Sequence, residues 1–166
     1  MNTMFYKTLD DFLGDRASRF FGGGYKNTDL RIHSVQICGE SSSLSAMLDI
    51  DIAGGWSSHH GNERRYHLSN VEALVVAGQS VQALLYWLDG LRREEVDNLW
   101  IRGLSIVNTR PIERYTDIPV HVACKEFLTA SVRGEPWRHA SLDITIDANA
   151  LAIKNYKACY RLPLAG

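Results

Sequence analysis

Residues 56–68, WSSHHGNERRYHL, hold the densest group of side chains in this chain that could do chemistry. Three of them, His59, His60 and His67, are histidines, a residue type that often binds metals. The adjacent His59 and His60 cannot easily converge on one ion, and no Asp, Glu or Cys stands beside them at ligand spacing. We therefore expect solvated loop histidines here and no metal site.

His67 differs from the other two because it lies two residues before Ser69, where a long helix is expected to begin. A neutral imidazole near pH 7 can hydrogen-bond a carbonyl oxygen, including that of a thioester, or transfer a proton. His67 is thus the first candidate catalytic residue. The alternative is a structural histidine whose ring is satisfied by local backbone groups.

Ser69 and Glu72 form the pattern S-x-x-E before an apolar run, which is typical of a capping box. Capping explains both residues, but a carboxylate in this position could also transfer protons, so Glu72 is the second catalytic candidate. Gln79, in the middle of the same run, could orient a carbonyl or a water, although an amide cannot act as a general base. We expect Ser69 and Gln79 to bind substrate together with Trp56 and Ser57 from the histidine-rich segment.

A single long helix, expected at residues 69–91, must position these side chains. Its sequence, SNVEALVVAGQSVQALLYWLDGL, is apolar on nearly every face, which predicts a buried helix. Strand patterns flank it on both sides, at residues 30–38, 44–53, 99–108, 118–133, 137–146 and 154–162. Runs of strands around one helix favour an α+β fold in which an antiparallel sheet wraps around the helix.

The element order matches a single hot-dog fold. A short helix at residues 9–21, ending at the glycines of residues 22–24, is expected to precede it. No linker, repeat or low-complexity tract divides the chain, so we expect one domain over residues 1–166. Since one small sheet leaves an edge strand open, a homodimer with a shared sheet is expected.

The composition excludes several classes of partner. A formal charge of −1 over 166 residues gives no electrostatic footprint for nucleic acid or an anionic membrane. The chain has three cysteines, Cys38, Cys124 and Cys159. Their odd number and wide separation are typical of reduced thiols in a cytoplasmic protein. The first twenty residues contain no continuous apolar region, so neither a signal peptide nor a membrane span is expected there.

Four short segments follow one another along the first two-thirds of the chain. They are Phe20-Phe21-Gly22-Gly23-Gly24-Tyr25-Lys26, Trp56-Ser57, Tyr66-His67-Leu68-Ser69 and the helix over residues 71–85. In this order they resemble the avirulence D (AvrD) family of bacterial proteins. That family in turn resembles the hot-dog butenolide synthases of A-factor biosynthesis, which join a β-ketoacyl thioester to a small hydroxyketone.

The resemblance implies an enzyme that acts on a β-ketoacyl or β-hydroxyacyl thioester of coenzyme A or a carrier protein, in signal or secondary-metabolite biosynthesis. Condensation, dehydration and thioester hydrolysis all remain open, and no cofactor is implied. Proteins of this family look about twice as long and resemble two hot-dog domains in tandem. The present chain has enough strands for one such domain, so the resemblance implies a homodimer or a heteromeric pair. The alternative is a non-catalytic binding module or a structural partner of a catalytic homologue.

Overall fold

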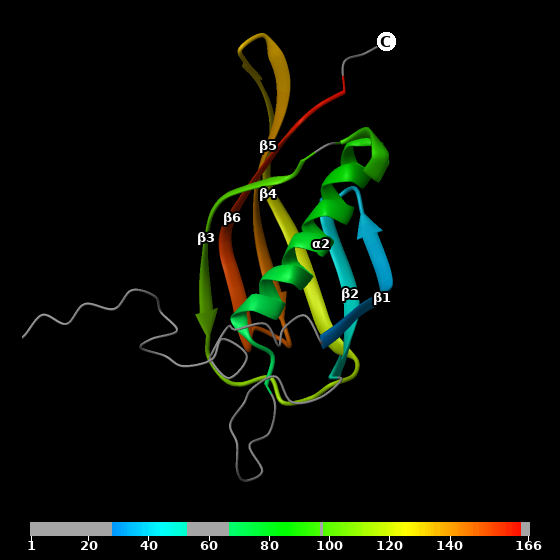
Figure 1. The fold of residues 1–166 in the computed structure, drawn as a ribbon, viewed down its shortest axis with the longest axis vertical. Coiled ribbons are helices and arrows are strands. Elements are labelled where there is room, and N and C mark those ends of the chain that lie inside the picture. Colours follow the sequence, from blue (N-terminus) through cyan, green and yellow to red (C-terminus); the bar gives the residue numbers. More distant parts are fainter. Residues whose placement is uncertain (1–27, 53–66, 97, 164–166) are drawn as a thin grey trace, which may run out of the picture.

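The computed structural model of the chain describes residues 28–52, 67–96 and 98–163, and in these residues two strands precede a long helix and four follow it (Figure 1). The strands before the helix are β1 (Thr28–Cys38) and β2 (Ser43–Ile52). The helix is α2 (Asn70–Asp89), followed by the short 3-10 helix η3 (Arg93–Glu95). The remaining strands are β3 (Trp100–Asn108), β4 (Ile118–Val132), β5 (Glu135–Ile146) and β6 (Leu151–Arg161). The expected helix at residues 9–21 lies outside the described residues.

The strands form one antiparallel six-stranded sheet in the order β1-β2-β4-β5-β6-β3. β4, β5 and β6 follow one another as a meander, whereas β3 pairs with β6 at the far edge, and the sheet curves around α2 (Figure 1). The predicted α+β class and the antiparallel sheet around one helix are therefore confirmed. The arrangement is consistent with a hot-dog-like fold.

The turn between β5 and β6 is tighter than the sequence suggests. Asp147, Ala148 and Asn149 have φ angles of 52°, 50° and 72°, in the left-handed region. Asp and Asn tolerate this region better than most residues, which makes a short reversal possible here. Ile146 and Leu151 consequently pair directly, and β6 begins three residues before the expected Lys154.

Alternating apolar side chains line the concave face of the sheet. Along β2, for example, Met47 is 37% exposed while its neighbours on both sides are buried. Successive strand side chains point to opposite faces, so this alternation turns one apolar row toward α2. The buried positions in β2, β4 and β5 are Leu44, Ala46, Leu48, Ile50, Ile118, Val120, Val122, Leu142, Ile144 and Ile146.

We expected α2 to be buried on nearly every face, and this is wrong for one side. Val75 is 39% and Trp87 51% exposed, and Gln79 and Ala83 between them are exposed as well. Positions four residues apart lie on one helix face, so these four side chains form a single exposed stripe. The opposite side packs into the core with Ala73, Val76, Ala77, Val81, Leu84 and Leu85. By length and composition α2 could also cross a membrane, as core helices often can.

The C-terminal end of α2 is held by a polar cluster. Asp89 would be unfavourable beside the partial negative charge of a helix C-terminus. Here its carboxylate accepts two hydrogen bonds from the Arg138 guanidinium, one from Nε at 3.0 Å, and another from the Tyr160 hydroxyl, which also lies 3.2 Å from the carbonyl of Leu85. Burial and the Asp89 carboxylate raise the pKa of Tyr160, so its hydroxyl remains a donor at neutral pH. This cluster fixes the end of α2 to β5 and β6.

Two matched substitutions in α2 test the distinction between its buried and exposed sides. Leu85→Asp places an unpaired charge at a position with 0% exposure, and we expect it to cost about 4 kcal/mol or more of unfolding free energy. Val75→Asp lies on the exposed stripe and is expected to cost less than about 1 kcal/mol. Urea denaturation followed by circular dichroism measures both, and equal losses would contradict the orientation of α2.

Candidate functional site

The N-terminal end of α2 carries the predicted capping box. The backbone amide and the hydroxyl of Ser69 each lie 2.9 Å from Glu72 Oε2, and the Glu72 amide donates to Ser69 Oγ at 3.3 Å. Ser69 is the N-cap residue and has extended backbone angles. The expected structural role of this pair is confirmed, because the cap satisfies donors that the first helical turn would otherwise leave unpaired.

Capping occupies only one of the two carboxylate oxygens of Glu72. The residue is 1% exposed, and its Oε1 atom has no hydrogen-bond partner among the described residues. A buried carboxylate oxygen without a donor is costly, and native proteins retain few such atoms outside functional sites. Glu72 therefore presents an acceptor that a ligand or a proton could use.

His67 lies at the same end of the molecule and is exposed. It lines a shallow hollow of about 290 Å³ together with Asn108, Thr109, Arg110 and other residues of the β3–β4 connection. The chain next to it is fixed, since the amide of Leu68 donates to the carbonyl of Ile112 at 3.1 Å. The structure thus places His67 at a cavity beside the start of α2, and no hydrogen bond or ion pair joins its side chain to Glu72 in the described part of the chain.

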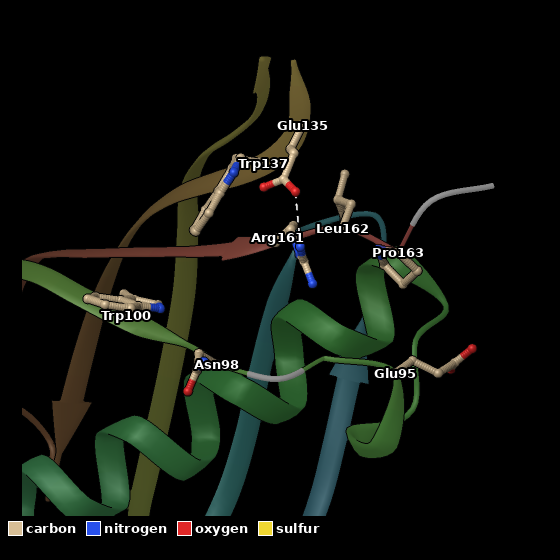
Figure 2. Close-up of a pocket in the computed structure, with 8 residues that line it drawn as sticks. All are labelled: Glu95, Asn98, Trp100, Glu135, Trp137, Arg161, Leu162 and Pro163. Atoms are coloured by element: carbon tan, nitrogen blue, oxygen red, sulfur yellow. Dashed lines mark hydrogen bonds and ion pairs between the residues drawn. The ribbon is translucent and has the colours of Figure 1, made fainter. Parts of the chain in front are cut away.

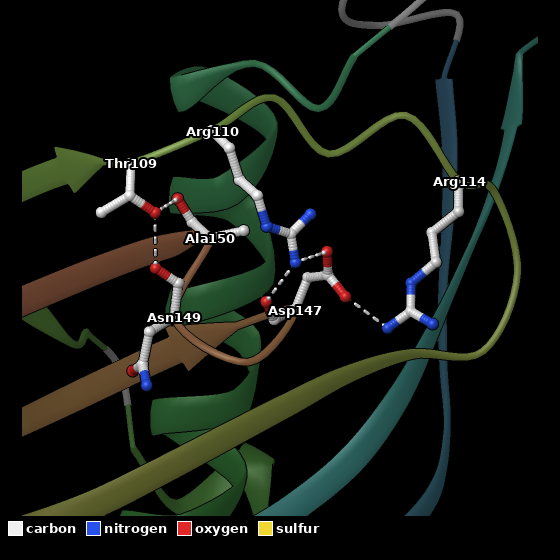
Figure 3. A network of polar contacts seen from close by, with 6 residues as sticks. All are labelled: Thr109, Arg110, Arg114, Asp147, Asn149 and Ala150. Atoms are coloured by element: carbon white, nitrogen blue, oxygen red, sulfur yellow. Dashed lines mark hydrogen bonds and ion pairs between the residues drawn. The ribbon is translucent and has the colours of Figure 1, made fainter.

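Asp147 holds the wall of this hollow in place (Figure 3). Its carboxylate lies between Arg110, at 2.8 Å, and Arg114, while Arg110 also donates to the Asp147 carbonyl at 3.2 Å. Thr109 adds hydrogen bonds to the carbonyls of the β5–β6 turn at 3.1 and 3.2 Å. The network ties the connection that follows β3 to the β5–β6 turn.

Of the remaining candidates, the structure describes Gln79 alone, and it lies away from this end of α2. Trp56 and Ser57 lie outside the described residues. Gln79 lies on the exposed stripe, at the rim of a groove of about 350 Å³ between α2 and β3. The groove is lined by Leu74, Val75, Gly78, Gln79, Gln82, Arg93, Asn98, Leu99, Ile101 and Tyr156. The sequence did not indicate this groove, because it joins a helix face to a strand edge that are far apart along the chain.

A further hollow, of about 400 Å³, opens at the other end of β3 (Figure 2). Trp100 and Trp137 contribute to its wall, and Arg161 lies between them and Pro163, where it pairs with Glu135 at 3.0 Å. Trp100 pairs in register with Cys159, and Trp137 with Arg161, which puts both indole rings on the outer face of the sheet. This hollow is separate from the candidate residues at the start of α2.

Among the described residues, one set of potential metal ligands lies near β1 and β2. The ligand atoms of His33, Asp49 and Asp117 lie within 4.8 Å of one another. They already interact, since His33 Nε2 is 3.2 Å from Asp49 Oδ1, which also accepts the Asp117 amide at 3.0 Å. The Asp117 amide, and then the His33 ring, lower the pKa of Asp49. These hydrogen-bonding contacts account for the cluster.

Comparison with known proteins now gives the family. The family model described as Pseudomonas avirulence D protein (AvrD) matches residues 4–79 and 70–162 of the chain. No curated protein matches it. The two matched segments together span nearly the whole sequence, including α2 and all the strands described above, so the resemblance inferred from the four short motifs is confirmed and the chain belongs to the AvrD family.

Proposed function

We propose that this AvrD-family chain is a single hot-dog domain over residues 1–166. Its substrate is an acyl thioester of coenzyme A or a carrier protein, with a β-ketoacyl or β-hydroxyacyl group. The reaction serves signal or secondary-metabolite biosynthesis in the cytoplasm. The observation that carries the proposal is the buried Glu72 carboxylate, which lies in the first turn of the central helix with one oxygen unused among the described residues.

The arrangement supports chemistry next to a carbonyl. Backbone amides in the first turn of a helix, together with its partial positive charge, can polarise a thioester carbonyl and stabilise the enolate or tetrahedral oxyanion derived from it. A base is then needed to remove a proton from the α-carbon or from a water molecule. Glu72 Oε1 and the His67 imidazole are the candidates for this step, and Ser69 holds Glu72 in place through the cap.

A complete capping box also favours a second candidate function. Because Ser69 and Glu72 already have a structural task, this domain could bind an acyl ligand without catalysis, as a binding module or as the partner of a catalytic homologue. The two functions differ in what the Glu72 charge does. A cap needs only an acceptor oxygen, whereas a general base needs the carboxylate.

Turnover assays with capping variants separate the two functions. The chain is incubated with β-ketoacyl, β-hydroxyacyl and saturated acyl thioesters of coenzyme A and a carrier protein, and products are identified by mass spectrometry. Glu72→Gln keeps an oxygen for the cap and removes the charge, so a catalytic Glu72 predicts an unchanged Tm and about a hundredfold lower turnover. Glu95→Gln is the matched control, because the Glu95 carboxylate likewise accepts from the amide of the N-cap residue of its helix, that of Arg92 in η3, at 2.6 Å.

The same assay tests His67. Since the side chain is exposed, His67→Ala should leave the Tm unchanged, and it should lower turnover by about a hundredfold if the imidazole transfers the proton. A loss of turnover for Glu72→Gln alone would assign the proton transfer to Glu72. If the folded wild-type chain converts none of the thioesters, the catalytic proposal is wrong and the binding module takes its place.

We also propose a homodimer that pairs two β3 strands. β1 and β3 are the two edge strands of the sheet. On β3, Trp100 is 52% exposed and Ile101 is 49% exposed. Light scattering at micromolar concentration should give a mass near twice 18.7 kDa. Ile101→Lys is expected to yield monomers, since a lysine on an edge strand opposes pairing. Val35→Lys on β1 is the control and should remain dimeric, whereas a monomeric wild type would refute the dimer.

A further inference from the structure

The hairpin of β4 and β5 extends beyond the end of β2 (Figure 1). β2 pairs with β4 as far as Ala123, whereas β4 continues to Val132 and stays paired with β5 over this whole length. The register shifts once, between Cys124 and Glu126, and is regular from there to the turn. The distal part of β4, residues 127–132, therefore has a strand on one side and an open edge on the other among the described residues.

The turn of this hairpin determines which backbone groups face the open edge. Arg133 and Gly134 have φ angles of 54° and 82°, which are typical of a two-residue type I′ turn. Such a turn is closed by a hydrogen-bonded pair, here Val132 with Glu135. Antiparallel pairs then alternate between hydrogen-bonded and non-hydrogen-bonded ones along the hairpin. The residues of distal β4 whose amide and carbonyl groups point away from β5 are consequently Phe127, Thr129 and Ser131.

The neighbours of Ser131 support this assignment. Its partner in register is Pro136, which has no amide hydrogen to donate to β4. The Pro136 carbonyl accepts a hydrogen bond from the Leu162 amide at 2.9 Å, so it points to the β6 side of the hairpin. In a non-hydrogen-bonded pair both residues direct their backbone groups outward, so Ser131 directs its own to the open edge.

The side chains of this edge do not oppose pairing with another strand. Residues 127–132, FLTASV, contain no charge and no proline, and Leu128 and Val132 are 60% and 42% exposed. Natural proteins commonly protect an open edge with charged residues, proline or a bulge. The edge strand β1, by contrast, carries Arg31 and pairs irregularly with β2 after His33. Distal β4 is therefore an unprotected edge with regular spacing of donors and acceptors.

A second copy of the same segment is complementary to this edge. Two-fold antiparallel pairing centred on Thr129 places Phe127 of one copy opposite Ser131 of the other. The outward amides and carbonyls of both copies then meet as hydrogen-bonded pairs. On the faces of the new pair Leu128 lies opposite Ala130, a large side chain beside a small one, and no two like charges are opposed within the stretch.

We propose that the distal edge of β4, residues 127–132, pairs with the same edge of a second copy of this chain. The edge lies on the β2 side of the hairpin, whereas β3 is the last strand at the opposite end of the sheet, so this contact is separate from the proposed β3 pairing. It does not depend on the acyl-thioester function. Six residues of strand make a small interface, so association requires concentrations well above the micromolar range.

Sedimentation velocity on the Ile101→Lys variant isolates this contact, because that substitution opposes the β3 pairing. The mass should rise from one chain at micromolar to two chains at millimolar concentration. Leu128→Lys, added to Ile101→Lys, should keep the mass at one chain, since Leu128 is exposed and a lysine on an edge strand opposes pairing. A mass that stays at one chain up to millimolar concentration would refute the second copy and leave a strand of another protein as the occupant.

Substitutions of Ser131 test the backbone itself. Ser131→Pro removes an amide at the open edge, where natural strands tolerate proline, and should abolish the rise in mass. Ser131→Ala removes only the hydroxyl and keeps the amide, so it is the matched control and should associate as before. Equal association of the proline and alanine variants would refute the pairing of this edge.

Amide hydrogen exchange measured by NMR tests the same groups without substitution in this edge. In Ile101→Lys the Thr129 and Ser131 amides should exchange rapidly at micromolar concentration and become protected at millimolar concentration. The Ala130 amide, which faces β5, should be protected in both samples. Protection of Thr129 and Ser131 that does not change with concentration would overturn the proposal, because the edge would then have a partner within one chain or none in the second copy.

Discussion

The position of α2 on the sheet depends on the Asp89 carboxylate at its C-terminal end. Asp89 repels the helix dipole at this place, and its burial, at 7% side-chain exposure, adds a desolvation cost. The Arg138 guanidinium offsets both with two hydrogen bonds, and it is itself packed over the Phe127 ring at 4.1 Å. Removing one partner would leave a buried charge unpaired, which costs more than the pair contributes to stability. The cluster thus acts mainly by allowing one position of α2 and excluding others.

Fixing α2 at this end also determines which of its faces remains open. With Leu84 and Leu85 held against the sheet, the stripe from Val75 to Trp87 must point away from it. β3 borders this stripe but is joined to the sheet through β6 alone, with irregular pairing between Ile101 and Ser105. Helix and strand edge therefore form a groove. The groove is a consequence of the way the core packs, and Tyr156 reaches it because its strand lies directly beneath.

The features that the sequence predicted are local ones. The capping box at Ser69 and Glu72 spans four residues, and the strand pattern at residues 44–53 belongs to one short segment, so both could be predicted without tertiary information. The exposed stripe of α2 could not be predicted from the sequence, because Val75 and Trp87 are as apolar as the buried residues beside them. The partners of Asp89 lie 49 and 71 residues further along the chain, and nothing in the pattern around Arg138 or Tyr160 indicates this contact. For the same reason Tyr156 looked like an ordinary strand residue.

Among the described residues, several buried polar groups with unused hydrogen-bonding capacity lie on α2 or against it, including the side chains of Glu72, Ser80, Tyr86 and Tyr156. Glu72 offers an acceptor in the first turn, and Tyr156 offers a donor opposite Gly78. Six residues separate these helix positions, which corresponds to about 9 Å along the axis. The acceptor of Glu72 and the hydroxyl opposite Gly78 are therefore too far apart to bind the same atom of a ligand.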